Sequence, residues 1–257
     1  MIINHNIASM NTHNQLAINN SATSKSIEKL SSGLRINRAA DDAAGLSISE
    51  KMRGQIRGLT QASRNAQDGI SRIQTAEGAL NEVSNMLVRM KELAVQNANG
   101  TYNADDKANL QLEMGSLSSE INNIFTNTKF NGTAVLTSAA TIIISDDGTT
   151  NLAIAATATT GITSLTSAST VSSIETAIKN VNKARATYGS QQNRLESTVR
   201  NVNTTVENLQ AAESRIRDTD MANEMATFTK NNILQQAATA MLAQANQAPQ
   251  GVLNLLR

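Results

Sequence analysis

The stretch IETAIKNVNKARATYGSQQNRLESTVRNVNTTVENLQAAESRI, residues 174–216, carries the strongest periodic pattern in the chain. Mostly apolar side chains recur there in alternating steps of four and three residues over about six heptads, the pattern of a helix that packs lengthwise against other helices. The residues on this stripe are Ile174, Ile178, Val181, Arg185, Tyr188, Gln192, Leu195, Val199, Val202, Val206, Leu209, Glu213 and Ile216. At a rise of about 1.5 Å per residue, the stretch predicts one helix about 65 Å long.

Two further helices are predicted upstream, near residues 43–98 and 105–127. The loop-like stretch NANGTYNADD, residues 97–106, separates them, with Asp105 expected to cap the second helix. The apolar stripe of the first helix consists of Ile48, Met52, Ile56, Leu59, Ala62, Ala66, Ile70, Ile73, Ala76, Leu80, Val83, Leu87, Met90 and Ala94. The second presents Leu110, Leu112, Leu117, Ile121, Ile124 and Phe125. The three predicted helices would pack lengthwise as a rod.

The only strand-like segment lies in the middle of the chain. TIIISDDGTTNLAIA, residues 141–155, has two apolar runs separated by Asp147–Gly148, which predicts a β-hairpin. Residues 156–173 are rich in Ser and Thr and are expected to be exposed, and the wider tract 137–173 could accept O-linked glycans. The predicted fold class is therefore mainly α: an elongated antiparallel helical bundle or coiled coil with a small β-hairpin region.

Composition excludes several classes of function. Aromatic residues make up 2% of the 257 residues, so a thick globular core is not expected. A net charge of +1 without a basic stripe argues against nucleic acid as a partner. The absence of Cys removes disulfides and cysteine metal sites. No run is apolar enough to span a membrane, and the N-terminal stretch MIINHNIASMN lacks the features of a cleaved secretory signal peptide.

The two ends of the chain share one character. Residues 1–33 and 218–257 are amphipathic, with large apolar side chains among many Asn, Gln, Ser and Ala. A single partner helix cannot wrap such an arm completely, and ordering its backbone costs conformational entropy that partial burial does not offset. We therefore expect both arms to be mobile in the lone chain and to become ordered when neighbouring copies surround them.

The paired acids in SSGLRINRAADDAAGLSISEKMR, residues 31–53, are the strongest candidate for a chemical site. Gly33 is a typical breaker at the end of a helix, so Asp41 or Asp42 is expected to cap the next one. A catalytic pair would need further polar partners, which the surrounding sequence does not supply. His5 and His13 are eight residues apart, which is not the i, i+4 spacing of a helical metal site. No catalytic residue, metal or cofactor is predicted, and the chain is not expected to be an enzyme.

Five long stretches of the sequence carry a resemblance to a known family: NHNIASMN at 4–11, KLSSGLRINRAADDAAGLSISEKMRGQIRGL at 29–59, DGISRIQTAEGALNE at 68–82, RMKELAVQNANGTYN at 89–103 and NILQQAATAMLAQANQAPQGVLNLLR at 232–257. They resemble bacterial flagellin, the subunit of the flagellar filament. Only the region of roughly 135–170 lies outside the resemblance. The chain is similar to a short form of the family that lacks large outer domains.

The resemblance implies an architecture and a set of partners. The terminal arms would form an inner helical layer around a channel, and the rod helices would form the layer outside it. Export through the flagellar type III machinery without a cleaved signal, an export chaperone at the C-terminal region, and filament cap and hook-junction proteins are also implied. On this basis we divide the chain into N-terminal arm 1–40, N-terminal rod helices 41–134, hairpin and Ser/Thr tract 135–173, C-terminal rod helix 174–217 and C-terminal arm 218–257.

The stretch RMKELAVQ, residues 89–96, resembles the segment that a host Toll-like receptor reads in many flagellins. By this resemblance, recognition would fall on Arg89, Glu92 and Leu93, with Glu113 on the neighbouring helix. The alternative is that Arg89 and Glu113 simply pair between helices while Leu93 packs inside the filament. Both interpretations can hold for one chain in its free and polymerised states.

The function expected from these observations is structural: an extracellular subunit that polymerises through its terminal helices into the flagellar filament for swimming motility. Two alternatives remain open at this level: a hook–filament junction protein, which shares the terminal helices, and a secreted coiled-coil adhesin. The residues expected to carry self-assembly are Ile3, Ile7, Met10, Leu30, Leu34, Met225, Phe228, Ile233, Met241, Leu253 and Leu256.

Overall fold

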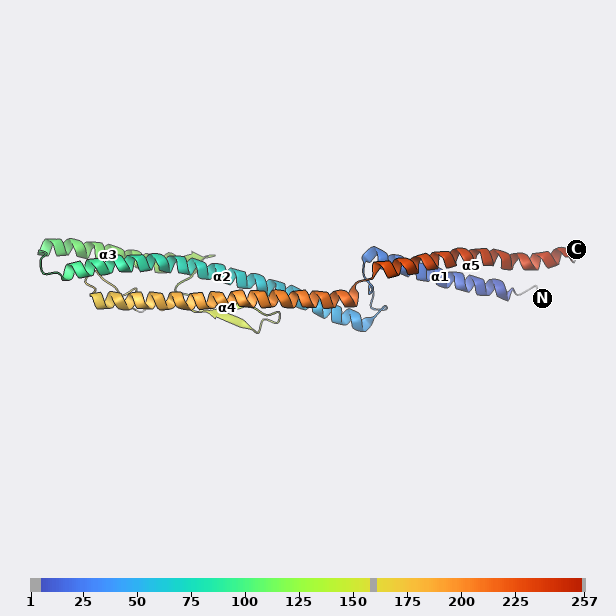
Figure 1. The fold of residues 1–257 in the computed structure, drawn as a ribbon, viewed down its shortest axis with the longest axis horizontal. Coiled ribbons are helices and arrows are strands. Elements are labelled where there is room, and N and C mark those ends of the chain that lie inside the picture. Colours follow the sequence, from blue (N-terminus) through green and yellow to red (C-terminus); the bar gives the residue numbers. More distant parts are fainter. Residues whose placement is uncertain (1–5, 158–160, 256–257) are drawn as a thin grey trace. The chain divides into compact units, whose positions relative to one another are not determined.

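The computed structural model describes residues 6–157 and 161–255, and the side chains of the last helix as far as residue 247. The described residues are mainly α-helical, as predicted, with two small antiparallel strand pairs in the middle of the chain (Figure 1). The elements are α1 (Ile7–Ser32), α2 (Ala43–Ala98), α3 (Ala104–Asn127), β1 (Lys129–Phe130), β2 (Thr133–Ala134), β3 (Ala140–Ile143), β4 (Asn151–Ile154), α4 (Val171–Arg217) and α5 (Met221–Leu255).

The chain forms two compact units. One contains residues 1–54 together with 209–257, and the other contains residues 55–208. We call them the terminal unit and the central unit. The division cuts through α2 and α4, so each unit holds a part of both long helices. The five segments predicted from the sequence follow the ends of the helices instead, and that finer division stays a prediction.

The central unit is an antiparallel helical bundle. An ion pair of 2.9 Å between Lys91 and Glu175 joins the end of α2 to the beginning of α4. Near the other end, the Ser63 hydroxyl donates to the Asn203 side chain at 3.1 Å. These contacts require α2 and α4 to run in opposite directions. The buried residues of the hydrophobic core cluster all lie between positions 66 and 195, so this core belongs to the central unit alone.

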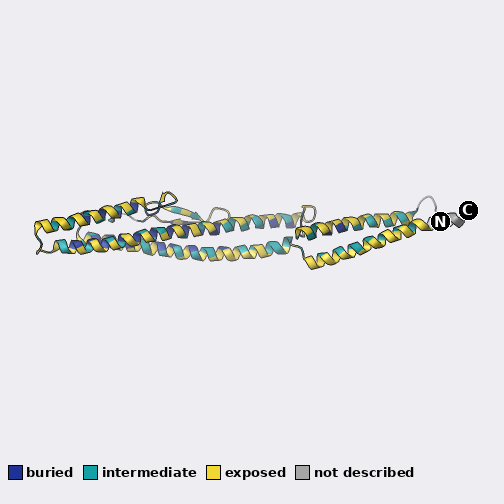
Figure 2. Ribbon diagram, turned by 90° about the horizontal axis from the view of Figure 1, so that it is seen from above, coloured by how far each residue is buried: buried dark blue, intermediate teal, exposed yellow. Residues whose placement is uncertain are grey.

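The heptad stripe of α4 lies where the sequence predicts. Each of its thirteen positions is buried or partly buried, and Tyr188 is its largest fully buried side chain. The Tyr188 hydroxyl shares a 2.8 Å hydrogen bond with Thr157, and burial raises the pKa of the phenol. The α2 stripe is likewise inward-facing, except for Ile48, which is exposed. Figure 2 shows the buried residues concentrated on these helices.

The predicted hairpin is present as β3 and β4, which pair antiparallel from Ala140 opposite Ile154 to Ile143 opposite Asn151. Side chains of α2 and α4 bind two of its backbone carbonyls. The Asn65 side chain of α2 donates to the Ile143 carbonyl at 3.2 Å, and Gln191 of α4 donates to the Ala153 carbonyl at 3.3 Å.

The turn of this hairpin is held by Asp147. Its carboxylate accepts hydrogen bonds from the hydroxyls of Ser145 and Thr149 and from the Thr149 N–H, and these bonds lower its pKa to about 2. Hydrogen bonds to the charged form of a carboxylate favour that form. The Asp147 side chain therefore stays ionised at any ordinary pH.

Three local predictions need correction. The β1–β2 pair was not predicted, although Asn131–Gly132 between the strands, both at positive φ, is a typical two-residue hairpin turn. The cap of α3 is Asn103, whose side chain accepts from the Asp106 N–H, and not Asp105. The Ser/Thr-rich tract is only partly exposed, because Ile162 and Leu165 join the core. Residues 158–160 of that tract lie outside the described residues.

The hairpin turn approaches α2 at Gly58, and this contact yields a prediction. A Cβ at Gly58 would lie 2.8 Å from the Asp146 Cβ and 3.0 Å from its Cα, whereas a Cβ at Gly78 would meet nothing within 4 Å. Alanine in a helix interior is favoured over glycine by about 1 kcal/mol. Gly78→Ala should therefore raise the free energy of unfolding by about that amount. Gly58→Ala should gain less or lose stability, because the turn must move.

Urea unfolding of both variants, with hydrogen exchange of the amides at 144–150, measures this difference. Faster exchange in the turn is expected for Gly58→Ala only. Equal stabilisation by both substitutions, with unchanged exchange in the turn, would show that the hairpin does not depend on close contact with α2.

Candidate functional site

Large apolar side chains are exposed along both terminal helices. They show between 41% and 69% of their surface, values typical of polar residues. We call this set the arm surface: Ile7, Met10, Ile18 and Ile27 on α1, and Met221, Met225, Ile233, Leu234 and Met241 on α5. Figure 2 shows both helices as mostly exposed or intermediate. Nine large apolar side chains exposed on two neighbouring helices indicate an interface.

The α5 side chains of the arm surface point in many directions. At about 100° per residue, they cover about 220° of the helix circumference, from Met221 round to Leu234. The remaining arc contains Phe228 and Leu242, which are partly buried. A helix that is apolar nearly all round requires neighbours on several sides. In the described chain α5 has one helical neighbour, α1.

The α1 helix has a narrower apolar stripe. Ile7, Met10 and Ile18 fall within about 80° of one another, roughly opposite Thr23. Thr23 and Ser26 are the buried residues of α1, and no described side chain of α5 is buried. The pair therefore leaves most of its large apolar side chains exposed to solvent. Pattern reasoning missed Thr23 and Ser26, because Ser and Thr are usually surface residues.

The two helices run antiparallel, with Cα atoms of one within 8 Å of the other. At one end the Asn6 side chain donates to the Ala245 carbonyl at 2.8 Å, and Ser9 donates to the Asn246 side chain at 2.8 Å. At the other end Lys29 and Glu224 form an ion pair of 3.9 Å. Between them, residues 7–24 and 231–247 contain no Asp, Glu, Lys or Arg. Charge thus contributes little to this part of the surface.

A short backbone clamp holds the beginning of α5 beside the end of α1. Gly33 ends α1 at φ +71°, the left-handed conformation that favours glycine, and its N–H donates to the Lys29 carbonyl at 2.8 Å. The Gly33 carbonyl accepts from the Thr219 N–H at 2.9 Å, and the Arg35 N–H donates to the Arg217 carbonyl at 2.6 Å. Leu34 and Asp218 thus form an isolated antiparallel bridge.

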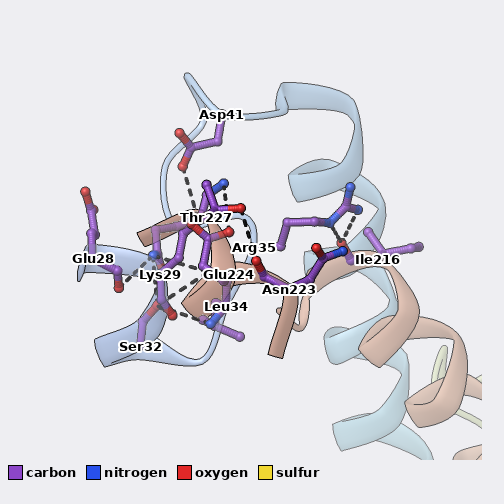
Figure 3. A network of polar contacts seen from close by, with 11 residues as sticks. Glu28, Lys29, Ser32, Leu34, Arg35, Asp41, Ile216, Asn223, Glu224 and Thr227 are labelled. Atoms are coloured by element: carbon purple, nitrogen blue, oxygen red, sulfur yellow. Dashed lines mark hydrogen bonds and ion pairs between the residues drawn. The ribbon is translucent and has the colours of Figure 1, made fainter. Parts of the chain in front are cut away.

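Side chains reinforce the clamp (Figure 3). The Arg35 guanidinium points toward the last turn of α4 and donates to the Ile216 carbonyl, at 3.2 Å from Nε. Arg217 forms an ion pair with Glu50 on α2, and this contact lowers the pKa of Glu50. The N-terminal and C-terminal connections are therefore tied together before the two terminal helices begin to run side by side.

The two neighbouring aspartates have different roles. The Asp42 carboxylate accepts from the Gly45 N–H at 2.9 Å, which is the geometry of a helix N-cap at the start of α2. Asp41 does not cap the helix. Its carboxylate accepts from the N–H groups of Arg38 and Asn37, at 3.0 and 3.2 Å, and closes the preceding turn.

The hydrogen bond from the Arg38 N–H, opposed by partial desolvation and assisted by the bond from Asn37, lowers the pKa of Asp41 below 3.8. The carboxylate therefore supports this turn above pH 3.8, and that support is lost as the pH falls through the lowered value. Both acids were candidates for the cap because both stand at the predicted start of the helix. The sequence does not show the direction in which each side chain points.

The residues predicted to carry self-assembly fall into three groups. Ile7, Met10, Met225, Ile233 and Met241 are exposed members of the arm surface. Leu30, Leu34 and Phe228 are partly buried. Ile3 and Leu256 lie outside the described residues, and Leu253 is placed in α5 without a described side chain. The arm surface also contains Ile18, Ile27, Met221 and Leu234, whose amphipathic spacing was visible in the sequence.

The receptor-like motif is only partly at the surface. Arg89 forms ion pairs with Glu113 of α3 at 2.9 Å and with Glu92 at 3.3 Å. The hydrogen bond that Arg89 donates to Glu113 is the main cause that raises the pKa of Arg89. All three side chains are about half exposed. Leu93 is 1% exposed and belongs to the core of the central unit. The expectation that the free chain presents Leu93 is therefore wrong, because this side chain packs within its own molecule.

Across residues 6–157 and 161–255, no group of three or more His, Cys, Asp or Glu side chains is placed to hold a metal ion. Within the same residues, no helix combines the length and the apolar character that a membrane span needs. His13 is exposed on α1, and His5 lies outside the described residues.

Comparison with known proteins gives matches to one family at both ends of the chain and to relatives over its full length. The family description "Bacterial flagellin N-terminal helical region" matches residues 3–141, and "Bacterial flagellin C-terminal helical region" matches residues 171–256. A flagellin from Halalkalibacterium halodurans is 52% identical over 272 residues, and one from Bacillus subtilis is 48% identical over 304. The flagellar filament 33 kDa core protein of Treponema phagedenis is 47% identical over 286. Each alignment covers 100% of both chains.

The separate roles of the two aspartates predict different effects of substitution. Asp42→Ala removes the N-cap of α2 and should lower the free energy of unfolding by about 0.5–2 kcal/mol. Asp41→Ala leaves that cap in place and should loosen only residues 37–41. Urea unfolding gives the first effect, and hydrogen exchange of the Gly45 amide, faster in Asp42→Ala alone, locates it. Equal exchange at Gly45 in the two variants would contradict the assignment.

Proposed function

The chain belongs to the bacterial flagellin family, and we propose that copies of it polymerise through the arm surface. One observation carries the proposal: the terminal helices contribute nothing to the chain's hydrophobic core cluster, yet they expose nine large apolar side chains. Burying one such side chain contributes about 1.5–3 kcal/mol. Neighbouring copies would supply the several sides of contact that α5 needs and that α1 alone does not provide.

The function is that of a structural subunit of the flagellar filament. In the proposed assembly, the arms of stacked copies form an inner helical layer and the central units lie outside it. Contacts between different surfaces of successive copies generate an open helical polymer rather than a closed ring. Such a tube would be stiff enough to transmit torque for swimming, outside the cell, and the chain's part in this is mechanical, with no catalytic step.

Further partners of the chain follow from family membership. We propose that an export chaperone covers α5 before assembly, because α5 has exposed apolar side chains around most of its circumference. The chain would leave through the flagellar type III machinery without a cleaved signal. Filament cap and hook-junction proteins would meet the first and last copies through the same terminal helices.

We also propose that a host Toll-like receptor recognises the unpolymerised chain at Arg89, Glu92 and Glu113. These three side chains form one half-exposed charged cluster across α2 and α3. Their charges are partly satisfied within the cluster and remain accessible to hydrogen-bonding groups of a partner. Leu93 would act from beneath, by holding this part of α2 against the core.

Substitution on the arm surface tests polymerisation. Ile233 is 61% exposed in the lone chain, so Ile233→Gln should leave its unfolding curve and helical content nearly unchanged. Seeded filament growth should fall sharply, because a polar amide would be buried between copies. Ile233→Leu, which keeps the apolar volume, is the matched control and should grow. Normal growth of Ile233→Gln would count against the proposal.

The receptor proposal needs a test that separates binding from helix pairing. Arg89→Ala should lower signalling by monomeric chain in cells that report receptor activation. Arg185→Ala is the control, because Arg185 also pairs between helices, with Glu77 at 4.0 Å. Circular dichroism should confirm that both variants remain folded. Equal signalling by the two variants would mean that Arg89 serves only the contact with Glu113.

A further inference from the structure

The methionines of the described chain divide between two environments. Met10, Met221, Met225 and Met241 belong to the arm surface and are 48–63% exposed. Met90 and Met114 are 0% exposed in the core of the central unit. Met52 and Met86 are partly buried. The most exposed thioethers therefore lie on the helices that carry assembly, and the best protected ones lie where assembly is not involved.

Exposed thioethers react with hydroperoxides by oxygen transfer. The sulfur lone pair attacks one peroxide oxygen, the O–O bond breaks, and a new S–O bond forms. With hydrogen peroxide, the sulfur loses two electrons and the second oxygen departs as hydroxide. The hydroxide takes up the proton released by the oxygen now bound to sulfur and leaves as water. The product is methionine sulfoxide, which is polar and can be reduced again by the two sulfoxide reductases. The rate at each position follows the access of the oxidant to the sulfur.

We propose that Met10, Met221, Met225 and Met241 form an oxidation-sensitive site that controls polymerisation. The inference rests on the proposed assembly through the arm surface. In the free chain all four sulfurs are reached by a hydroperoxide, and oxidation places polar oxygens on the surface that must be desolvated. A chain modified in this way stays folded, because Met90 and Met114 remain protected, but it no longer joins the filament.

The position of the four side chains explains why oxidation acts on assembly. Met221 and Met225 lie on one side of α5, and Met241 lies on roughly the opposite side, so sulfoxides would affect contacts with more than one neighbour. Burying a polar group without a hydrogen-bond partner is unfavourable, and the thioether offered only dispersion contacts in its place. A chain already inside the filament has these sulfurs covered by other copies. The sensitivity therefore belongs to the unassembled chain.

Hydrogen peroxide is the probe. Dilute monomeric full-length chain is treated with it, and the sulfoxide content of each methionine is measured by peptide mass spectrometry. We expect the four arm methionines to be oxidised before Met90 and Met114. Seeded growth should fall in proportion to the sulfoxide content of these four residues. Treatment with both sulfoxide reductases should restore growth. Preformed filaments given the same treatment should show far less oxidation at these four positions.

The matched control carries Met10→Leu, Met221→Leu, Met225→Leu and Met241→Leu together. This variant keeps an apolar arm surface and should grow after peroxide treatment as it does before. If these substitutions themselves prevent growth, reversal of the loss in the parent chain by the reductases provides the test.

The outcomes separate this inference from the proposed function. Failure of untreated parent chain to grow from seeds would overturn assembly itself. Normal growth of parent chain that is fully oxidised at the four positions would overturn the inference alone. Equal loss of growth in the leucine variant after treatment would also overturn it, because the damage would then lie elsewhere.

Discussion

The α5 helix presents apolar side chains around most of its circumference, and in the described part of the chain it packs lengthwise against α1. A helix buries such a surface only when it is enclosed, and α1 covers little more than one side. Thr23 and Ser26 are the buried residues of α1, whereas Ile233 and Met241 on α5 stay exposed. This exposed apolar surface of α5 explains how the rest of the molecule is organised. In the proposed assembly, other copies cover the surface that the chain leaves exposed.

The central unit, in contrast, buries its apolar side chains between its own helices. Its helices run antiparallel, and the heptad stripe of α4 faces inward over its whole length. The β3–β4 hairpin lies across α2 and α4, where Asn65 and Gln191 bind its backbone. The hydrophobic core cluster contains no residue of the arms, and the proposed contacts between molecules lie on the arms. Folding and assembly are thereby assigned to different parts of one chain.

The clamp between residues 33–35 and 217–219 connects these two roles. It ties the end of α1 to the beginning of α5 through backbone hydrogen bonds, which do not depend on side-chain identity. Gly33 permits the turn, and Asp41 and Asp42 stabilise the turn and the helix that follow. Both terminal helices are therefore presented together, as one two-helix surface, and this surface carries almost no charge over most of its length.

Sequence periodicity determined which segments are helical and which side chains face inward in the central unit, because heptad spacing repeats over tens of residues and leaves little freedom. The predicted helix 43–98 matches α2, and the hairpin near 141–155 was recognised from its Asp-Gly turn. Long motifs at both ends also identified the family.

Such patterns do not show the direction in which a single side chain points. Asp41 and Asp42 are neighbours of the same type, yet only the Asp42 carboxylate binds the start of α2. The tertiary structure alone decided that Leu93 is enclosed by its own chain and that Thr23 and Ser26 are the buried residues of α1. Burial depends on what packs opposite a side chain, and a linear pattern does not contain that partner.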